Sequence, residues 1–326
     1  MSKRYAIVSI GTNSTRLLLA DIDPENPRIE VARSIGTRIG EGLGERGRLG
    51  DEPMQRTLDA LAQLTRAVRG HYVRLFAVGT SALRRAENGD EFAQRVTALT
   101  GVSLRVLSGE EEAKASYRGA LTAFEKLRGE RVGVLDMGGG STEYATGDSL
   151  EPESVVSCEI GAVRLTEAVP SLAGRDGAPD TSAVEKARAI ARDALKPLTD
   201  CAAVDQLAFV GGSATTTAAI VRGRPSPHGS SSLTRADLQR WLERLLAMTL
   251  DERKRVAGMK RQRADILPAG IIVLDTALEL IGRDRAIATT ADLLLGILLQ
   301  ERDAAGPRSL WDGGGIGRHS RLNEIR

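Results

Sequence analysis

The sequence predicts an α/β protein built from two related domains. Segments typical of strands and of helices alternate along the chain, a pattern that favours mixed α/β domains. A glycine-rich segment near the N-terminus recurs 127 positions later with the same spacing of residues. The chain has 326 residues, of which 41% are hydrophobic, and this length is enough for two hydrophobic cores rather than one.

The first predicted elements are three strands, where aliphatic and β-branched residues cluster between Gly, Asn and Pro breaks: 4–11, 16–23 and 28–36. Apolar residues then recur at helical spacing between Asp51, the predicted N-cap, and Gly70, the predicted stop. The rest of this half contains a strand at 73–79, a helix at 90–101 capped by Asp90, a strand at 102–107 and a helix at 109–126.

The second half repeats this alternation. It begins with a strand at 131–136 that leads into a glycine-rich turn. The elements that follow are a helix at 182–198, a strand, glycine turn and helix at 206–221, a helix at 235–248 that starts near Thr234, and an apolar helix at 291–303. A tail rich in Gly, Arg and Ser begins at Gly306, and we expect the tail, 306–326, to be mobile.

The repeat aligns without a gap. Shifted by 127 positions, "IVSIGTNSTRLL" falls on "VLDMGGGSTEYA". The matched pairs are Gly11 with Gly138, Ser14 with Ser141, Thr15 with Thr142 and Arg16 with Glu143. A chance match is the alternative, because a strand, a glycine turn and a Ser-Thr pair are common in unrelated sequences. We favour duplication, which places two equivalent turns face to face across a cleft and sets Arg16 against Glu143.

Both turns carry the residue types that bind anions. Glycines let the backbone approach a ligand closely, successive N–H groups form anion-binding concavities, and Ser and Thr add hydroxyl donors. The turns are therefore candidate phosphate loops. An ordinary hairpin turn is the alternative, and it would explain "GTNST" taken alone. Neither turn matches the nucleotide P-loop or the dinucleotide-binding glycine pattern.

Three glutamates open the helix predicted at 109–126. Ser108 and Glu111 fit the capping-box pattern, and Glu110 lies where the helix dipole stabilises negative charge. Glu112 has less of a structural explanation. We expect the start of this helix to aim the Glu112 side chain at whatever the two turns hold.

Two further carboxylates bracket the second turn. Asp136 ends the preceding strand, and Glu143 follows seven residues later. Carboxylate oxygens and water are the ligands by which Mg²⁺ is commonly held at phosphate sites. The pair is therefore a candidate metal site, with solvent-exposed turn carboxylates as the alternative interpretation.

Composition excludes several classes of partner. The net charge of +2 argues against duplex nucleic acid, and 3% aromatic residues leave few platforms for single strands. Most of the 45 basic residues are arginine, whose guanidinium groups recognise anions. Cys158 and Cys201 fit no metal spacing and no disulfide framework. We expect a cytoplasmic protein that binds no membrane, since no apolar run has the length of a membrane helix or secretory signal.

Eight motifs together resemble those of one family. In chain order they read "SIGTNSTRLLLAD", "GTSALRRAENGDEF", "LSGEEEAKASYRGAL", "VLDMGGGSTEY", "EIGAVRLTE", "FVGGSATTTAAI", "PHGSSSLTRADL" and "RADILPAGIIVL". Over residues 4–305 the chain resembles the exopolyphosphatase and guanosine pentaphosphate phosphohydrolase family, part of the superfamily of actin, sugar kinases and heat-shock ATPases.

The resemblance implies a fold and an activity. The fold is two ribonuclease-H-like α/β domains with the active site in the cleft between them. We assign 1–126 with 288–305 to the first domain and 127–287 to the second. The activity is hydrolysis of a terminal phosphoanhydride bond, with Mg²⁺ or another divalent cation as cofactor.

The resemblance also implies roles for individual residues. Glu112 matches the family's catalytic glutamate, and Asp136 and Glu143 match carboxylates that would hold the metal. Arg16 and Arg84 would neutralise phosphate charge, with interdomain or surface salt bridges as the alternative. The other phosphate-binding residues that it implies are Gly11, Thr12, Asn13, Ser14, Gly138, Gly139, Gly140, Ser141 and Thr142.

Two positions depart from the family pattern. Ser9 stands where members usually carry Asp before the first glycine, whereas its repeat partner is Asp136. Residues 293–296 read "LLLG" where the family often has "LREG". We interpret the basic run at 251–263 as a solvated helix face in preference to a polyphosphate track. We interpret His228 as a loop residue rather than a metal ligand.

Several functions remain open at this point. The leading hypothesis is an exopolyphosphatase acting on inorganic polyphosphate, and its near rival is a hydrolase that converts pppGpp to ppGpp. A sensor of polyphosphate or nucleotide without turnover is the non-enzymatic alternative, to which Ser9 lends weight. A sugar kinase of the same superfamily would need an acceptor-activating aspartate and an adenosine pocket. We expect a homodimer by default.

Overall fold

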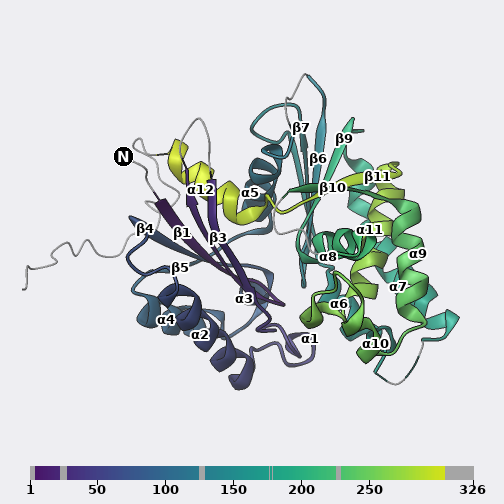
Figure 1. Cartoon of the computed structure of the whole chain (residues 1–326), viewed down its shortest axis with the longest axis horizontal. Coiled ribbons are helices and arrows are strands. Elements are labelled where there is room, and N and C mark those ends of the chain that lie inside the picture. Colours follow the sequence, from purple (N-terminus) through teal and green to yellow (C-terminus); the bar gives the residue numbers. More distant parts are fainter. Residues whose placement is uncertain are drawn as a thin grey trace, which may run out of the picture.

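The computed structural model describes residues 4–22, 28–124, 129–175, 177, 179–224 and 229–304. Two mixed β-sheets, each flanked by helices, form two halves that lie side by side (Figure 1). The predicted α/β class is therefore confirmed. Within these residues, no helix is both long and apolar enough to cross a membrane.

The first sheet has five strands in the order β3-β2-β1-β4-β5. Strand β1 pairs antiparallel with β2 and parallel with β4. The strands are β1 (Arg4–Ile10), β2 (Thr15–Asp21), β3 (Arg28–Ile35), β4 (Arg74–Gly79) and β5 (Leu104–Val106). The helices of this half are α1 (Leu43–Arg46), α2 (Asp51–Arg66), α3 (Ser81–Arg85) and α4 (Gly89–Thr100).

The second sheet has six strands in the order β10-β11-β9-β6-β7-β8. The strands are β6 (Val132–Met137), β7 (Thr142–Gly147), β8 (Ser154–Cys158), β9 (Gln206–Val210), β10 (Ser230–Thr234) and β11 (Arg285–Thr289). Its helices are α6 (Ala162–Ala168), α7 (Thr181–Ala194), α8 (Gly212–Arg222), α9 (Arg235–Leu246), α10 (Leu250–Arg255) and α11 (Leu267–Ile281). Three short 3₁₀ turns cover Pro170–Ala173, Lys196–Asp200 and Arg261–Arg263.

The predicted repeat is confirmed as a structural repeat. In the first hairpin, Ser9 lies opposite Arg16, and the N–H of Gly11 donates to the Ser14 carbonyl at 3.0 Å. The second hairpin reproduces both features one repeat later: Asp136 lies opposite Glu143, and the N–H of Gly138 donates to the Ser141 carbonyl at 3.0 Å. The outer strand order is also shared, because β8-β7-β6-β9 repeats β3-β2-β1-β4. The two candidate phosphate loops therefore have the same backbone.

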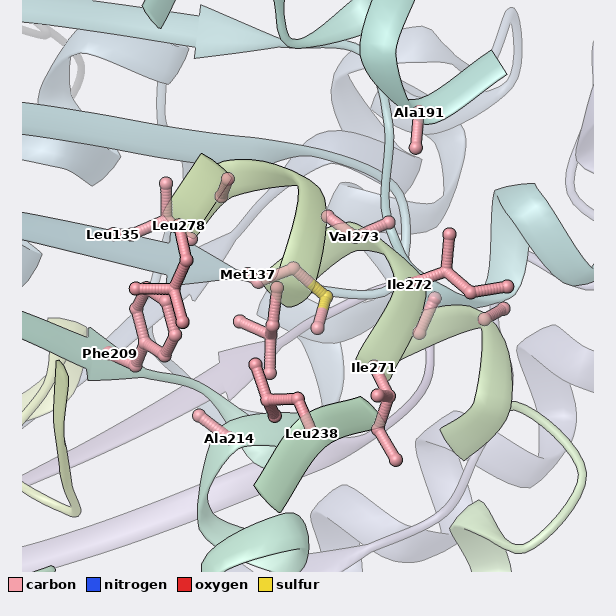
Figure 2. Packing of buried hydrophobic residues seen from close by; sticks show 14 of the residues in the cluster. Leu135, Met137, Ala191, Phe209, Ala214, Leu238, Ile271, Ile272, Val273 and Leu278 are labelled. Carbon is pink, nitrogen blue, oxygen red and sulfur yellow. The ribbon is translucent and has the colours of Figure 1, made fainter. Parts of the chain in front are cut away.

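Helix α11 forms the centre of the second half. It is apolar on nearly all sides and is buried from Leu267 to Leu278, as expected of a helix without a polar face. Figure 2 shows its residues Ile271 and Leu278 in one cluster with Leu135 of β6 and Phe209 of β9. This packing supports the strand that ends at the second glycine turn.

Two further helices join the halves: α5 (Gly109–Leu121) and α12 (Leu293–Asp303). Helix α5 leads from the first sheet to β6, and α12 follows β11 and packs against α5 and β1 (Figure 1). Their backbones touch. A Cβ atom at Gly296 would lie 1.7 Å from the carbonyl oxygen of Ala115, and one at Gly119 would lie 2.2 Å from that of Asp292.

Several helix boundaries differ from the predictions, and α2, for example, ends at Arg66 before the predicted stop at Gly70. Gly50 rather than Asp51 is the N-cap of α2, so Asp51 instead places its charge in the first turn, where the helix dipole favours it. Asn88 rather than Asp90 precedes α4, and its amide is held by the backbone of Leu49. Helix α5 ends at Leu121, and α7 gives way to a 3₁₀ turn that contains Pro197.

The basic run at 251–263 is only in part the solvated helix face that we predicted, because Arg255, Lys260 and Arg261 are exposed whereas Arg253 and Arg263 are buried. Helix α10 covers only its first part, and Arg253 is fully buried there. The Arg253 guanidinium donates to the carbonyls of Leu245 and Leu172, each at 2.7 Å, and so ties α10 to the preceding helix and the 3₁₀ turn at 170–173. The buried Arg253 side chain therefore has a structural role in packing these elements together.

The crossing of α5 and α12 predicts the cost of one methyl group. Gly296→Ala should lower the midpoint of thermal unfolding by several degrees, because overpacking in a tight core costs about 1–3 kcal/mol. Gly44→Ala in α1 is the matched control, since a Cβ there would meet only the Glu167 carboxylate at 3.8 Å. Calorimetry of both variants checks the expectation, and equal midpoints would show that the crossing tolerates a wider separation.

Candidate active site

Four turns from the two sheets converge where the halves meet. Two are the glycine hairpins at 11–14 and 138–141, and the others are the strand-to-helix turns that begin α3 and α8. A Cβ atom at Gly140 would lie 2.7 Å from the hydroxyl of Thr12 and 2.8 Å from that of Ser81. Gly211, with φ of +96°, would similarly bring a Cβ within 3.2 Å of the Asp136 carboxylate. The absence of side chains at these glycines lets the turns approach one another.

Neighbouring loops hold the carbonyl groups of both hairpins. The N–H groups of Arg38 and Gly40 donate to the carbonyls of Asn13 and Thr12, at 3.0 and 3.1 Å. In the second hairpin the carbonyls of Gly138 and Gly139 accept from the start of α6, at 3.1 and 2.9 Å. Because the carbonyl groups of each turn accept hydrogen bonds from a neighbouring loop or helix, the backbone of each turn is held in place.

Glu112 is the acid that α5 delivers to these turns. The predicted capping box is confirmed, since Ser108 accepts from the N–H of Glu111 and the Glu111 carboxylate accepts from that of Ser108. Glu110 is solvent-exposed and pairs with Lys114 at 2.6 Å. Glu112 is only 6% exposed, and its carboxylate accepts from Nη1 of Arg84 at 2.5 Å. Of the three glutamates, only Glu112 is buried in the site.

The environment of Glu112 brings its pKa close to neutrality. Burial raises the pKa of this carboxyl to about 7, the hydrogen bond and charge of Arg84 oppose the rise, and the charge of Asp136 adds to it. A carboxyl with a pKa near the working pH can both accept and release a proton, which is the property of an effective general base.

Asp136 and Glu143 lie opposite each other on β6 and β7, beside Glu112. Ser116, one turn after Glu112 on α5, donates to Asp136, and Ser157 donates to Glu143 at 3.2 Å. Burial, followed by the charge of Asp292, raises the pKa of Asp136 to about 6. The pKa of Glu143 is raised well above its usual value by burial and by the charges of Glu112 and Asp136.

These carboxylates fit a divalent cation that is partly held by substrate. Among the described residues, no three or more His, Cys, Asp or Glu side chains are grouped as a complete metal site. Mg²⁺ commonly uses one or two carboxylates together with water and phosphate oxygens, and Asp136 and Glu143 offer oxygen ligands of that kind. A cation would also offset the burial and the neighbouring negative charges that raise both pKa values.

Buried polar atoms without a hydrogen-bond partner gather around the turns. Burying such atoms unpaired is costly, so they mark positions where a ligand could supply the missing partner. They are both side-chain polar atoms of Asn13, the hydroxyls of Ser81 and Ser213, Nη2 of Arg84 and Nε of Arg263. Nearly all are hydrogen-bond donors, which suits the oxygens of an anion.

The two predicted arginines have different partners. Arg84 donates from one nitrogen to both the Leu107 carbonyl and Glu112, which leaves its Nη2 unpartnered beside the site. Arg16 does not pair with Glu143, its counterpart in the repeat. Instead it forms an ion pair with Asp292, because α12 returns to this edge of β1 and β2.

Arg263 is a site residue that the sequence interpretation missed. It is 7% exposed and covers the N-terminus of α8, where a Cβ at Gly212 would lie 1.9 Å from the guanidinium carbon. Desolvation, then the charges of Arg16 and Arg38, lowers its pKa to about 10. Desolvation and the charges of Arg263 and Arg16 likewise lower the pKa of Lys260 to about 8.

These cations repel one another, so the region is electrostatically suited to a polyanion. The sequence signal was present in the dense basic run at 251–263. The turn at Gly258, with φ of +88°, breaks that run and redirects its second part toward the site.

A pocket adjoins the site through Ser157, whose hydroxyl donates to Glu143. This pocket of about 410 Å³ beside α5 is lined by Glu110, Lys114, Pro152, Glu153, Val155 and Ser157. Its two exposed acids make it a poor anion site compared with the turns. His228 and the tail at 306–326 lie outside the described residues.

Comparisons with known proteins agree with this geometry. Exopolyphosphatase 2 of Mycobacterium tuberculosis (strain CDC 1551 / Oshkosh) is 32% identical over 317 residues, which cover 91% of this chain and 98% of that protein. A bifunctional 3-dehydroquinate synthase/phosphatase of Fusobacterium nucleatum is 28% identical over 309 residues, or 90% of this chain. The match spans 46% of that longer protein, which is about half its length.

Solved structures show the same arrangement. An exopolyphosphatase from Cytophaga hutchinsonii superimposes with a TM-score of 0.84 at 26% identity, covering 93% of this chain and 99% of that one. The Ppx/GppA family member of Aquifex aeolicus gives 0.75 at 28% identity, with coverage of 93% and 99%. The model of the Ppx/GppA phosphatase family matches residues 19–303. The chain therefore belongs to the Ppx/GppA phosphatase family and is a phosphoanhydride hydrolase.

Proposed function

We propose that the protein is an exopolyphosphatase that releases terminal orthophosphate from inorganic polyphosphate. The observation that carries the proposal is the position of Glu112, a buried acid with a pKa of about 7, beside a ring of unpartnered buried donors from both halves. Donors of this kind stabilise the charge of a transferring phosphoryl group, and the acid activates the attacking water.

The terminal phosphate would lie between the two glycine turns. Residues 11–14 would bind it from the first half and 138–142 from the second, with Asn13 and Ser81 as unpartnered polar groups in reach. Arg84 would add one charged nitrogen from the side of Glu112. Binding from both halves fixes the phosphorus relative to the acid, and such positioning is the larger part of phosphoryl-transfer catalysis.

The chemical step then needs one proton transfer. Glu112 accepts a proton from water as the water oxygen bonds to the terminal phosphorus, and the bond from that phosphorus to the bridging oxygen breaks. The bridging oxygen leaves with the shortened chain, whose neighbouring donors balance its new charge. Asp136 and Glu143 would hold Mg²⁺ or another divalent cation, which when bound supplies positive charge to the phosphate oxygens.

The basic residues beyond the turns favour a polyphosphate chain over a nucleotide. Arg16 lies close enough to Lys260 and Arg263 to lower the pKa of each, and the three residues bring positive charge together near the first turn. None of the described side chains that we place in the site is aromatic, so none offers a platform for stacking guanine. Conversion of pppGpp to ppGpp is the alternative activity, and a sensor with the same cleft is the alternative without turnover.

Removal of the general base provides the first test. Glu112→Gln should reduce phosphate release from polyphosphate by about 10²- to 10⁴-fold, because the amide cannot accept the proton of water. Glu110→Gln is the matched control, an exposed glutamate two residues away whose loss should leave the rate unchanged. Phosphate release is measured with short polyphosphate, long polyphosphate and pppGpp in the presence of Mg²⁺.

The substrate series separates the three candidate functions. Release from pppGpp but not from either polyphosphate would replace the proposal with the nucleotide hydrolase. Tight binding without release from any of them would leave the sensor. Equal rates for Glu112→Gln and wild type would remove Glu112 from the role of base.

The pKa of Glu112 predicts the pH dependence. The base is active only when ionised, so kcat/KM should fall as pH drops below about 7, with a slope approaching tenfold per pH unit. Glu112→Gln should lose this inflection.

The free energy of unfolding should depend on pH in the opposite sense to kcat/KM. A carboxyl whose pKa is raised on folding binds more protons in the folded state, so the free energy of unfolding falls as pH rises from 4.5 toward 7.

Arg263 predicts a binding effect distinct from catalysis. Arg263→Gln should raise KM for polyphosphate about tenfold or more, since a hydrogen bond to a charged group contributes about 1.5–3 kcal/mol. The fold should tolerate the change, because it removes a buried cation with an unpartnered nitrogen. Arg261→Gln is the matched control, an exposed arginine of the same run. Equal KM values for the two variants would place the polyphosphate chain elsewhere.

A further inference from the structure

The two halves of the repeat differ in charge at one equivalent pair of positions. On β6 and β7 the pair is Asp136 opposite Glu143, two acids. On β1 and β2 it is Ser9 opposite Arg16, a neutral residue and a cation. Side chains directly opposite in an antiparallel pair have Cβ atoms about 4.5–5.5 Å apart. An acid at position 9 would therefore be within reach of Arg16, but this chain has none there.

A carboxylate from another element takes that place. Asp292 is the N-cap of α12, and it is 5% exposed. One oxygen of its side chain accepts from the N–H of Leu294 at 3.2 Å, and the other forms the ion pair with Arg16. The residue is thus bonded both to the helix that joins the halves and to the strand that leaves the first glycine turn.

The helix cap alone does not explain a charge at this position. Asn caps a helix about as well as Asp, and its amide carries no charge that must be buried. Asp292 is nearly buried, and it lies close to a second carboxylate, Asp136, whose pKa its charge raises. Its charge is compensated by the ion pair with Arg16 and by the nearby Lys260, whose pKa the charge of Asp292 raises. Lys260 and Arg263 in turn lie near Arg16 and repel its guanidinium.

We infer that Asp292 is a positioning residue of the active site, which holds the Arg16 guanidinium beside the first phosphate loop in place of the acid that position 9 lacks. The inference rests on the proposed hydrolysis of polyphosphate. It assigns to α12 a part in the chemistry as well as in joining the halves. Arg16, released from Asp292, would move away from its like-charged neighbours toward solvent, and the phosphate would lose an oriented cation.

Asp292→Asn separates the charge from the cap. The variant should keep the thermal midpoint of wild type, because Asn preserves the bond to Leu294. Its kcat for tripolyphosphate should fall about ten- to a hundredfold, since a misplaced clamp lowers the fraction of productive complexes. KM should stay the same or decrease, because the site has one negative charge fewer to repel the anion. Asp292→Ala is the comparison variant that loses both cap and charge, and its midpoint should fall.

Ser9→Asp provides the rescue. In the Asp292→Asn background it should restore most of the lost kcat, because the new acid lies opposite Arg16 on the neighbouring strand. In the wild-type background the same change should lower kcat, because it adds a third carboxylate beside Asp292 and Asp136. The opposite sign of one substitution in two backgrounds is the result that a merely structural role would not give.

Two outcomes would overturn the inference. One is a kcat and a KM for Asp292→Asn that both stay within about twofold of wild type, which would reduce Asp292 to a helix cap. The other is an equal effect of Ser9→Asp in both backgrounds. Failure of the proposed function is distinguishable, since the wild type itself would then release no phosphate. In that case the binding of tripolyphosphate to wild type and to Asp292→Asn is measured by calorimetry, which tests whether Asp292 positions Arg16 for the anion. Identical binding enthalpies and affinities of the two proteins would contradict the inference.

Discussion

The contact between the backbones of α5 and α12 is the constraint on which the rest of the structure depends. Gly119 and Gly296 allow the two helices to meet with no side chain between them. Each helix is also a connection between the halves, so their crossing fixes one sheet relative to the other. The N-terminal turns of the same helices deliver Glu112 and Asp292. One steric requirement, the absence of two methyl groups, therefore sets both the interdomain geometry and the position of the site acids.

Like charges lie close together in the candidate site, and this arrangement lowers the stability of the protein without substrate. Glu112, Asp136 and Glu143 lie close together, burial raises the pKa of each, and the charge of Asp136 raises the pKa values of Glu112 and Glu143 further. On the other side Arg263 is a buried cation, and the charges of Arg16 and Arg38 lie close to it. Glu112 pairs with Arg84 and Asp292 pairs with Arg16, but among the described residues no ion pair links Asp136, Glu143, Lys260 or Arg263 to an opposite charge. A substrate with several phosphates and a divalent cation would supply opposite charge to both groups, and its binding would stabilise the folded state.

The sequence alone predicted what depends on local pattern. The two sheets, the duplicated hairpins and the Ser108 capping box follow from periodicity, glycine turns and short spacings, and the structure confirms them. The roles of Arg263 and Asp292 could not be predicted in this way, because each depends on a contact with a residue far away in the chain. Solvation of a basic run is the usual outcome, and tertiary packing overrode it at Arg253. The assigned domain boundaries and catalytic roles remain predictions.

The duplicated hairpins provide two similar turns that suit phosphoryl transfer, and the differences between the two copies give each turn a different charge. In the proposed mechanism two equal turns would bind a phosphate from two sides, but equal charges on both sides would repel either the anion or the cation that it needs. The pair at positions 136 and 143 kept two acids, whereas the equivalent pair carries Arg16. Under the proposed mechanism one half would therefore hold the metal while the other would hold phosphate. The cation of the first half requires its own counter-charge when substrate is absent, and α12 supplies it through Asp292. The asymmetry of the repeat and the return of α12 are thus parts of one electrostatic arrangement.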